Sequence, residues 1–241
     1  MPRFFVSPDQ IPVISGEDVH HIRDVLRMQL GEELELLDGN GKAYQVKIAE
    51  YNKNTIICQI LSTKTIEDPT KVKITLAQCL PKADKMKLII QKSSELGVWS
   101  IIPIRSERTI AKSEKKERWQ TIAKEAAQQC RLTYVPNITE VKSFKEILSE
   151  AKDYSLAIIP WENEQEKSLK SLISISPDSP SQISRFPDIL ILIGPEGGFS
   201  TNEIELAKHA GFIPVSLGPR ILRTETAGLA MLAMINYEFG Q

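Results

Sequence analysis

Apolar and polar positions alternate in short runs over the first 70 residues, a pattern typical of β-strands. Strand-like runs occupy residues 33–37, 43–49 and 55–61. The sequence Asp38-Gly39-Asn40-Gly41 favours a hairpin turn between the first two runs, because Gly and Asn tolerate positive φ. Apolar residues at helical spacing predict one short helix from about residue 16 to 27. We therefore expect a small β-barrel domain over residues 1–70.

From residue 72 the pattern changes to an alternation of strands and helices. Strands are predicted at 73–80, 100–105, 156–161, 189–193 and 213–217, and helices at 84–96, 115–131, 144–151, 201–210 and 224–239. The run Ile189–Ile193 is apolar throughout, as expected for a strand covered by helices on both faces. Residues 162–187, rich in Ser, Glu, Lys and Pro, are expected to form an exposed connection with one short helix. The pattern predicts an α/β domain over residues 71–241 with a mostly parallel sheet.

Composition narrows the class of protein. The chain has 241 residues, of which 41% are hydrophobic and 25% charged, as in an average globular protein. No apolar run approaches the roughly 20 residues of a membrane span, and the first residues do not resemble a secretion signal. Three widely spaced cysteines fit neither a disulfide framework nor a zinc site. We therefore expect a cytoplasmic protein with no metal and no membrane association.

The net charge of −1 conceals an uneven distribution along the chain. Residues 1–70 carry a net charge of −4, residues 71–145 of +9 and residues 146–241 of −6. The basic segment could bind an anion such as nucleic-acid phosphate. Alternatively, its lysines form solvated helix faces, because Lys82, Lys85, Lys87 and Lys92 alternate with apolar residues at helical spacing. Charge alone does not decide between the two interpretations.

Two unusual loops follow predicted parallel strands, at the sheet edge where ligands of α/β proteins bind. The first, Gly194–Ser200, reads GPEGGFS, and its three glycines permit close approach of the backbone to a ligand. The second, Leu217–Ala227, reads LGPRILRTETA and concentrates two arginines, a glutamate and two threonines. Neither loop matches the glycine patterns that bind dinucleotides or nucleoside triphosphates. Apolar side chains and free backbone groups favour an adenosine-type cofactor, although tight turns and a helix cap would explain part of the pattern.

These two loops closely resemble the C-terminal motifs of the SPOUT-class RNA methyltransferases, and within them the RsmE family. Further stretches that match are MPRFF at the start, HHIRDVLRM at 20–28, PKADKMKLIIQKSSELGV at 81–98, and RSERTIAK followed by ERWQTIAKEAAQQ. The family methylates N3 of uridine 1498 in 16S ribosomal RNA of the 30S subunit. The resemblance implies a PUA-like N-terminal barrel, a C-terminal sheet tied in a trefoil knot, a homodimer, and S-adenosylmethionine as the cofactor.

The resemblance also implies the residues of the cofactor site, carried over motif by motif. They are Ile193, Gly194, Pro195, Glu196, Gly197, Gly198, Leu217, Gly218, Ile221, Leu222, Arg223, Thr226 and Ala227. For catalysis we expect Arg223 to stabilise the negative charge of deprotonated uracil, with Glu225 or a water as proton acceptor. A salt bridge from Arg223 to Glu196 or Glu225 that only shapes the loop is the alternative.

Basic residues of both domains are the candidates for RNA binding. They are Arg3, His20, Arg23 and Arg27 of the barrel, and Lys82, Lys85 and Arg131 of the basic segment. Two other functions stay open: methylation of a different RNA site by the same chemistry, and a non-catalytic RNA-binding or assembly factor with this fold.

Overall fold

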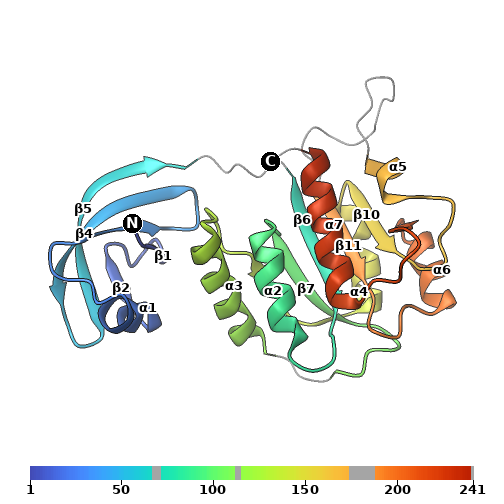
Figure 1. Ribbon diagram of the computed structural model, residues 1–241, viewed down its shortest axis with the longest axis horizontal. Helices are drawn as coiled ribbons and strands as arrows, with labels where there is room; N and C mark the ends of the chain where they lie inside the picture. Colours follow the sequence, from blue (N-terminus) through green and yellow to red (C-terminus); the bar gives the residue numbers. More distant parts are fainter. Residues whose placement is uncertain (67–71, 112–114, 174–187, 240–241) are drawn as a thin grey trace. The chain divides into compact units, whose positions relative to one another are not determined.

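The computed structural model describes residues 1–66, 72–111, 115–173 and 188–239 (Figure 1). The chain forms two compact units. The first comprises Met1–Asp68 and Ala127–Val135, and the second comprises Pro69–Ala126 and Pro136–Gln241. Segment 127–135 therefore belongs with the N-terminal residues although it lies far along the chain.

The first unit is built on a curled five-stranded sheet. Its strands are β1 (Arg3–Phe5), β2 (Val13–Ser15), β3 (Glu33–Leu37), β4 (Lys42–Tyr51) and β5 (Thr55–Thr65), in the order β1-β3-β4-β5-β2. All neighbours are antiparallel except β1 and β3. The predicted hairpin joins β3 to β4, and alternate residues such as Leu34, Val46 and Ile56 are fully buried. The predicted helix is a short one, α1 (Glu17–His20), continued by a π-helical turn, His21–Val25.

A charged cluster fixes β1 and segment 127–135 within this unit. The Arg3 guanidinium donates to the Glu35 carboxylate at 2.6 Å and to the Arg131 carbonyl at 3.2 Å. The Lys64 ammonium lies 2.9 Å from the same carboxylate. Burial raises the pKa of Glu35, but the hydrogen bond from Lys64 and the charges of Arg3 and Lys64 outweigh it and hold that pKa below its usual value.

The second unit contains the predicted parallel sheet. Its strands are β6 (Lys73–Cys79), β7 (Ser100–Arg105), β8 (Asn137–Ile138), β9 (Lys142–Ser143), β10 (Leu156–Pro160), β11 (Asp188–Ile193) and β12 (Ile213–Val215). The order among the described residues is β12-β10-β11-β6-β7-β8, with β9 also beside β7, and every pair is parallel. The prediction of a mostly parallel sheet is confirmed. The two-residue strands β8 and β9 are too short to produce a sequence pattern.

Helices cover both faces of this sheet (Figure 1). They are α2 (Lys85–Glu95), α3 (Lys116–Cys130), α4 (Phe144–Glu150), α5 (Leu169–Ile173), α6 (Thr201–His209) and α7 (Thr224–Phe239). Ala77 and Cys79 of β6 share a buried cluster with residues of α4 and α6. Leu76 and Gln78 point to the other face, where their side chains approach Gly228 of α7. Helix α7 also packs against α2.

The strand order places three loops side by side. Strand β10 lies between β11 and β12, so the loops that leave the carboxyl ends of all three strands share one edge of the sheet. Two of these are the glycine-bearing loops. The strand order by itself does not show a trefoil knot, so the knot stays a prediction.

Among the described residues, no helix has the length and apolar character that crossing a membrane requires.

Candidate functional site

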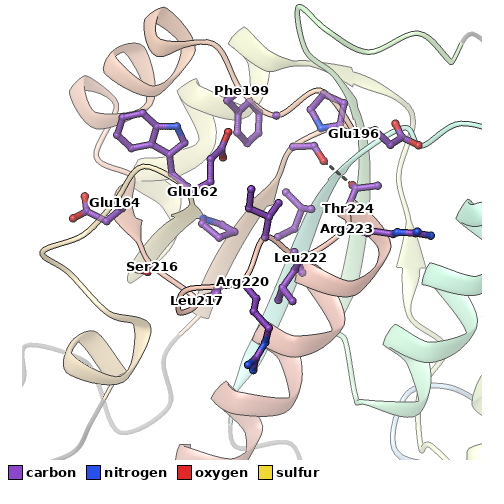
Figure 2. Close-up of a pocket in the computed structure, with 18 of the residues that line it drawn as sticks. Glu162, Glu164, Glu196, Phe199, Ser216, Leu217, Arg220, Leu222, Arg223 and Thr224 are labelled. Carbon is purple, nitrogen blue, oxygen red and sulfur yellow. Dashed lines mark hydrogen bonds between the residues drawn. The ribbon is translucent and has the colours of Figure 1, made fainter.

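A cavity of about 940 Å³ opens where the three loops meet (Figure 2). Its lining comes from Pro160–Glu162, Glu164 and Gln165 after β10, from Ile193–Phe199 after β11, and from Ser216–Thr224 with Ala227 after β12, together with Lys85 of α2. All of these residues belong to the second unit. The lining residues therefore lie within one compact body.

The first glycine loop is fixed at its far end by a helix cap. The Ser200 hydroxyl accepts from the Glu203 amide at 3.2 Å, and the Glu203 carboxylate accepts from the Ser200 amide at 2.9 Å. The same buried carboxylate also accepts from the amide of Glu107, in the loop after β7. The Arg108 guanidinium donates to the carbonyl of Gly197 at 2.8 Å. The loop thus has fixed partners outside its own segment.

Two positions of this loop require glycine. Gly198 has φ of +64°, and a Cβ there would lie 3.0 Å from Oε1 of Glu162. A Cβ at Gly194 would lie 3.0 Å from the ring of Phe199. The absence of these Cβ atoms brings the backbone close to the neighbouring loop and to the buried ring.

Thr224 joins the two glycine loops. Its buried hydroxyl donates to the carbonyl of Gly194 at 2.6 Å and accepts from Nε2 of Gln78 at 2.9 Å (Figure 2). Helix α7 starts here, because the carbonyl of Arg223 accepts from the amides of Thr226 and Ala227 at 2.8 and 2.9 Å. The helix cap that the sequence suggests for the second loop does not account for this bond between segments 30 residues apart.

The loop after β10 was not predicted to contribute. Trp161, Glu162 and Glu164 line the cavity between the two glycine loops, with Glu162 beside the first and Glu164 near Ser216 of the second (Figure 2). The Trp161 amide donates to the carbonyl of Val215, which fixes this loop to the end of β12. Hydrogen bonds from the amides of Lys167 and Glu166 lower the pKa of Glu164. The predicted strand at 156–161 could have indicated this contribution, because the carboxyl ends of parallel strands lie at the same edge of the sheet.

At the mouth of the cavity, in the part of the chain that the structure describes, Lys85 is paired with carboxylates, whereas Arg223 is not. The Lys85 ammonium lies 3.0 Å from one carboxylate oxygen of Glu225 and 4.0 Å from Glu196. The amide of Lys82 donates to Glu196 at 2.8 Å. Arg223 is exposed and makes no ion pair within the described ranges, so the predicted alternative of a salt bridge to Glu196 or Glu225 is not found. Lys85 makes the ion pair with Glu225 instead.

The ion pair also sets the proton affinity of Glu225. Burial raises the pKa of this carboxyl, but a hydrogen bond from its own amide, the hydrogen bond and charge of Lys85, and the charge of Arg223 together lower it below the usual value. A carboxylate in this state is a weak base.

The structure gathers the predicted cofactor residues around one cavity. All of them line it except Thr226, which is exposed on α7. Glu225, predicted as a candidate proton acceptor, also lies outside the lining. Residues that sequence analysis did not assign to the cofactor are Pro160, Trp161, Glu162, Glu164, Gln165, Phe199, Ser216, Pro219, Arg220, Thr224 and Lys85.

The lining fits a bulky cation with an aromatic part. Buried Ile193 and half-buried Leu217 and Leu222 supply apolar surface for the faces of a ring. The glycines have no side chains, so the backbone of the loop can come close to the edge of that ring. The carboxylates of Glu162 and Glu164 suit a ligand with positive charge. S-adenosylmethionine combines an adenine ring with a sulfonium and an ammonium group, so the residues present fit this cofactor.

The predicted RNA-binding residues are placed as follows. In the first unit, Arg3 is engaged by Glu35, His20 pairs with Asp24, and Arg23 donates to the carbonyl of Asn52 at 2.5 Å. Arg27 and Arg131 are exposed and have positive φ, of 54° and 64°. In the second unit, the Lys82 side chain is exposed and Lys85 is held by Glu225.

Within the parts of the chain that the structure describes, no group of three or more His, Cys, Asp or Glu side chains is arranged to hold a metal ion.

Comparison with known proteins connects this geometry to a family. Residues 68–236 match the family described as RNA methyltransferase domain, and residues 14–61 match the RNA methyltransferase PUA domain. The Ribosomal RNA small subunit methyltransferase E of Bacillus subtilis is 35% identical over 231 residues, which cover 93% of this chain and 89% of that protein. The PUA match agrees with the barrel expected from the sequence.

Solved structures of similar sequence share the whole architecture. The Ribosomal RNA small subunit methyltransferase E of Neisseria gonorrhoeae, crystallised with S-adenosyl methionine, is 33% identical with a TM-score of 0.83, over 98% of this chain and 97% of that one. A methyltransferase of Legionella pneumophila in complex with the same cofactor is also 33% identical, with a TM-score of 0.84 over 98% and 96% of the two chains.

Proposed function

Because the chain belongs to the ribosomal RNA small subunit methyltransferase E family, we propose that it transfers a methyl group from S-adenosylmethionine to N3 of uridine 1498 in 16S ribosomal RNA. The observation that carries the proposal is the cavity between three loops, joined by the bond from the Thr224 hydroxyl to the Gly194 carbonyl. That bond connects the two motifs whose sequences resemble the family.

We assign the cofactor to this cavity. Ile193, Leu217 and Leu222 would hold the adenine between apolar surfaces, and the backbone of both glycine loops would contact its edge. Glu162 and Glu164 would face the positive groups of the cofactor. When bound, S-adenosylmethionine supplies an electrophilic methyl group on a sulfonium.

The residues around the cavity then have to favour the deprotonated form of the uracil that accepts the methyl group. Uracil N3 carries a proton and becomes nucleophilic only when that proton leaves, which spreads negative charge onto the neighbouring oxygens. We assign stabilisation of this charge to Arg223, whose guanidinium is unpaired within the described structure and stands at the N-terminus of α7, where the helix dipole adds positive potential. Because Lys85 occupies both carboxylate oxygens of Glu225, we favour water as the proton acceptor.

The substrate and assembly complete the proposal. We propose that the RNA is presented in the 30S subunit, that the exposed basic residues Arg27, Lys82 and Arg131 contact its phosphates, and that the protein acts in the cytoplasm as a homodimer. The family resemblance supports the dimer and the subunit.

Replacement of Arg223 tests the assigned role. Arg223→Ala should lower kcat for methylation of 30S subunits by about 10²–10³-fold, the usual effect of removing one stabiliser of transition-state charge. Affinity for S-adenosylmethionine should change less than about threefold, because the side chain is exposed and bonds no other part of the cavity. Calorimetric titration and single-turnover methyl transfer measure the two quantities separately.

The control is Lys87→Ala, which removes an exposed cation of α2 that does not line the cavity. It should leave both quantities unchanged. Loss of cofactor binding together with turnover in Arg223→Ala would make Arg223 a residue that only shapes the loop and would contradict the assignment.

A further inference from the structure

Among the predicted RNA-binding residues, Lys85 alone lines the cavity. Its ammonium is bound to a carboxylate and is not free to contact an RNA phosphate. Its ammonium contacts both carboxylate oxygens of Glu225, at 3.0 and 3.1 Å, and its side chain is one-third exposed. Lys85 is also the first residue of α2, where a cation is disfavoured by the helix dipole. A carboxylate partner offsets that cost. The geometry is that of a fixed ion pair between two helix N-termini.

The partner of Lys85 has a second cation close by. Glu225 lies in the first turn of α7, two residues after Arg223, and the charge of Arg223 acts on it. Arg223 is thus a second cation close in the chain to the carboxylate that Lys85 contacts. In the described structure Lys85 holds it, and Arg223 makes no ion pair.

We propose that Lys85 is a positioning residue that occupies Glu225 and thereby keeps the Arg223 guanidinium available for an acidic nucleobase in its deprotonated form. The inference rests on the proposed function for the identity of that anion. It reassigns Lys85 from the RNA surface to the machinery that controls the charge of the site. An arginine captured by Glu225 would have its positive charge neutralised before the acceptor arrived.

The first test measures the availability of Arg223 without any substrate. Phenylglyoxal modifies unpaired guanidinium groups, and peptide mass spectrometry gives the rate at Arg223 itself. In Lys85→Met, Glu225 is free to pair with Arg223, and we expect that rate to fall about fivefold. The double variant Lys85→Met/Glu225→Gln should restore it. An unchanged rate in Lys85→Met, or no recovery in the double variant, would overturn the inference whether or not the proposed function holds.

The second test measures the consequence for methylation of 30S subunits. Lys85→Met should lower kcat about tenfold, with the KM for subunits and the Kd for S-adenosylmethionine little changed. Lys85→Arg should retain most of the activity. Adding Glu225→Gln to Lys85→Met should recover most of kcat, because the competing carboxylate is gone.

Combination with Arg223→Ala separates this role from a structural one. If Lys85 acts through Arg223, Lys85→Met should cause no further loss of single-turnover rate in the Arg223→Ala background. An additional tenfold loss there would overturn the inference. So would a raised KM with unchanged kcat in Lys85→Met, which is the behaviour of a phosphate contact. An inactive wild-type enzyme with the expected phenylglyoxal pattern would contradict only the proposed function.

Discussion

At the scale of single residues, the shape of the cavity depends on glycines that lack a Cβ and on one hydroxyl that bonds two segments. Gly198 has a left-handed backbone conformation, and the Glu162 carboxylate lies where its Cβ would approach. Thr224 uses one hydroxyl as both donor and acceptor, to Gly194 and from Gln78. The two residues come from different motifs, and each fixes a loop against a neighbouring segment. The geometry of the cofactor site should therefore be sensitive to changes of a single methyl group.

Replacement of Gly198 tests this sensitivity. Gly198→Ala places a methyl group 3.0 Å from Oε1 of Glu162 and forces an L-residue into positive φ, at a cost of about 1–2 kcal/mol in the free energy of unfolding. Because either the Glu162 carboxylate in the cavity lining or the loop must shift, affinity for S-adenosylmethionine should fall about tenfold. Urea unfolding and calorimetric titration measure the two effects.

The matched control is Gly211→Ala. Gly211 has φ of +98°, has no atom within 4 Å of the added Cβ, and does not line the cavity. This variant should lose stability to a similar extent while its cofactor affinity stays at the wild-type value. Equal loss of affinity in both variants would show that general destabilisation, rather than the shape of the loop, explains the result for Gly198.

At the scale of elements, the sequence predicts the strands that carry the two glycine loops but not the complete set of contacts around them. The apolar run Ile189–Ile193 and the Gly-rich segment after it are recognisable because a buried parallel strand and its loop have distinct compositions. Residues 162–165 have no such composition and were grouped with the exposed connection at 162–187. Its contribution follows only from the strand order, which places β10 between β11 and β12.

The shortest strands were also beyond prediction. Strands β1 and β2 have three residues each, and β8 and β9 have two, too few for an alternating pattern. They are fixed by pairing with distant segments, as when Arg3 of β1 pairs with Glu35 of β3. Whether such short strands form is decided by tertiary contacts, which the local sequence does not show.

The loop after β7 shows how one element supports another. Arg108 lies in the RSERTIAK stretch, and its guanidinium donates to the carbonyl of Gly197. We predict that Arg108→Ala raises the Kd for S-adenosylmethionine by roughly fivefold, about 1 kcal/mol, because the glycine loop loses one hydrogen bond from outside its own segment. Isothermal titration of both proteins at one salt concentration measures the change.

Lys116→Ala serves as the comparison for this variant. It removes the exposed ion pair to Glu140 at 2.7 Å, away from the cavity, and should leave the Kd unaltered. If Arg108→Ala also binds the cofactor with wild-type affinity, the bond to Gly197 has no role in positioning the loop.

At the scale of the whole molecule, two units with different sequence patterns form one chain. The hydrophobic pattern distinguishes a β-rich N-terminal part from a part with alternating strands and helices. The compact units are Met1–Asp68 with Ala127–Val135, and Pro69–Ala126 with Pro136–Gln241. The membership of 127–135 in the first unit was not visible in the sequence, because Ala127, which packs with Phe5 and Leu37, continues the helical pattern of the second. The knot and the dimer remain predictions.

The charge of the whole molecule is consistent with an RNA substrate but does not specify one. The segment 71–145, with its net charge of +9, contains exposed Lys82 and Arg131, whereas several other predicted RNA-binding side chains are already bonded within the protein. Specificity for one uridine must then come from the cavity and from the shape of the RNA around it.

The most direct test of the account is methyl transfer from labelled S-adenosylmethionine to purified 30S subunits that lack the modification, followed by mass mapping of the labelled nucleotide. We expect a single label, at N3 of uridine 1498, that disappears in Arg223→Ala. Label at another nucleotide, or no label from a protein that binds S-adenosylmethionine, would contradict the proposed function.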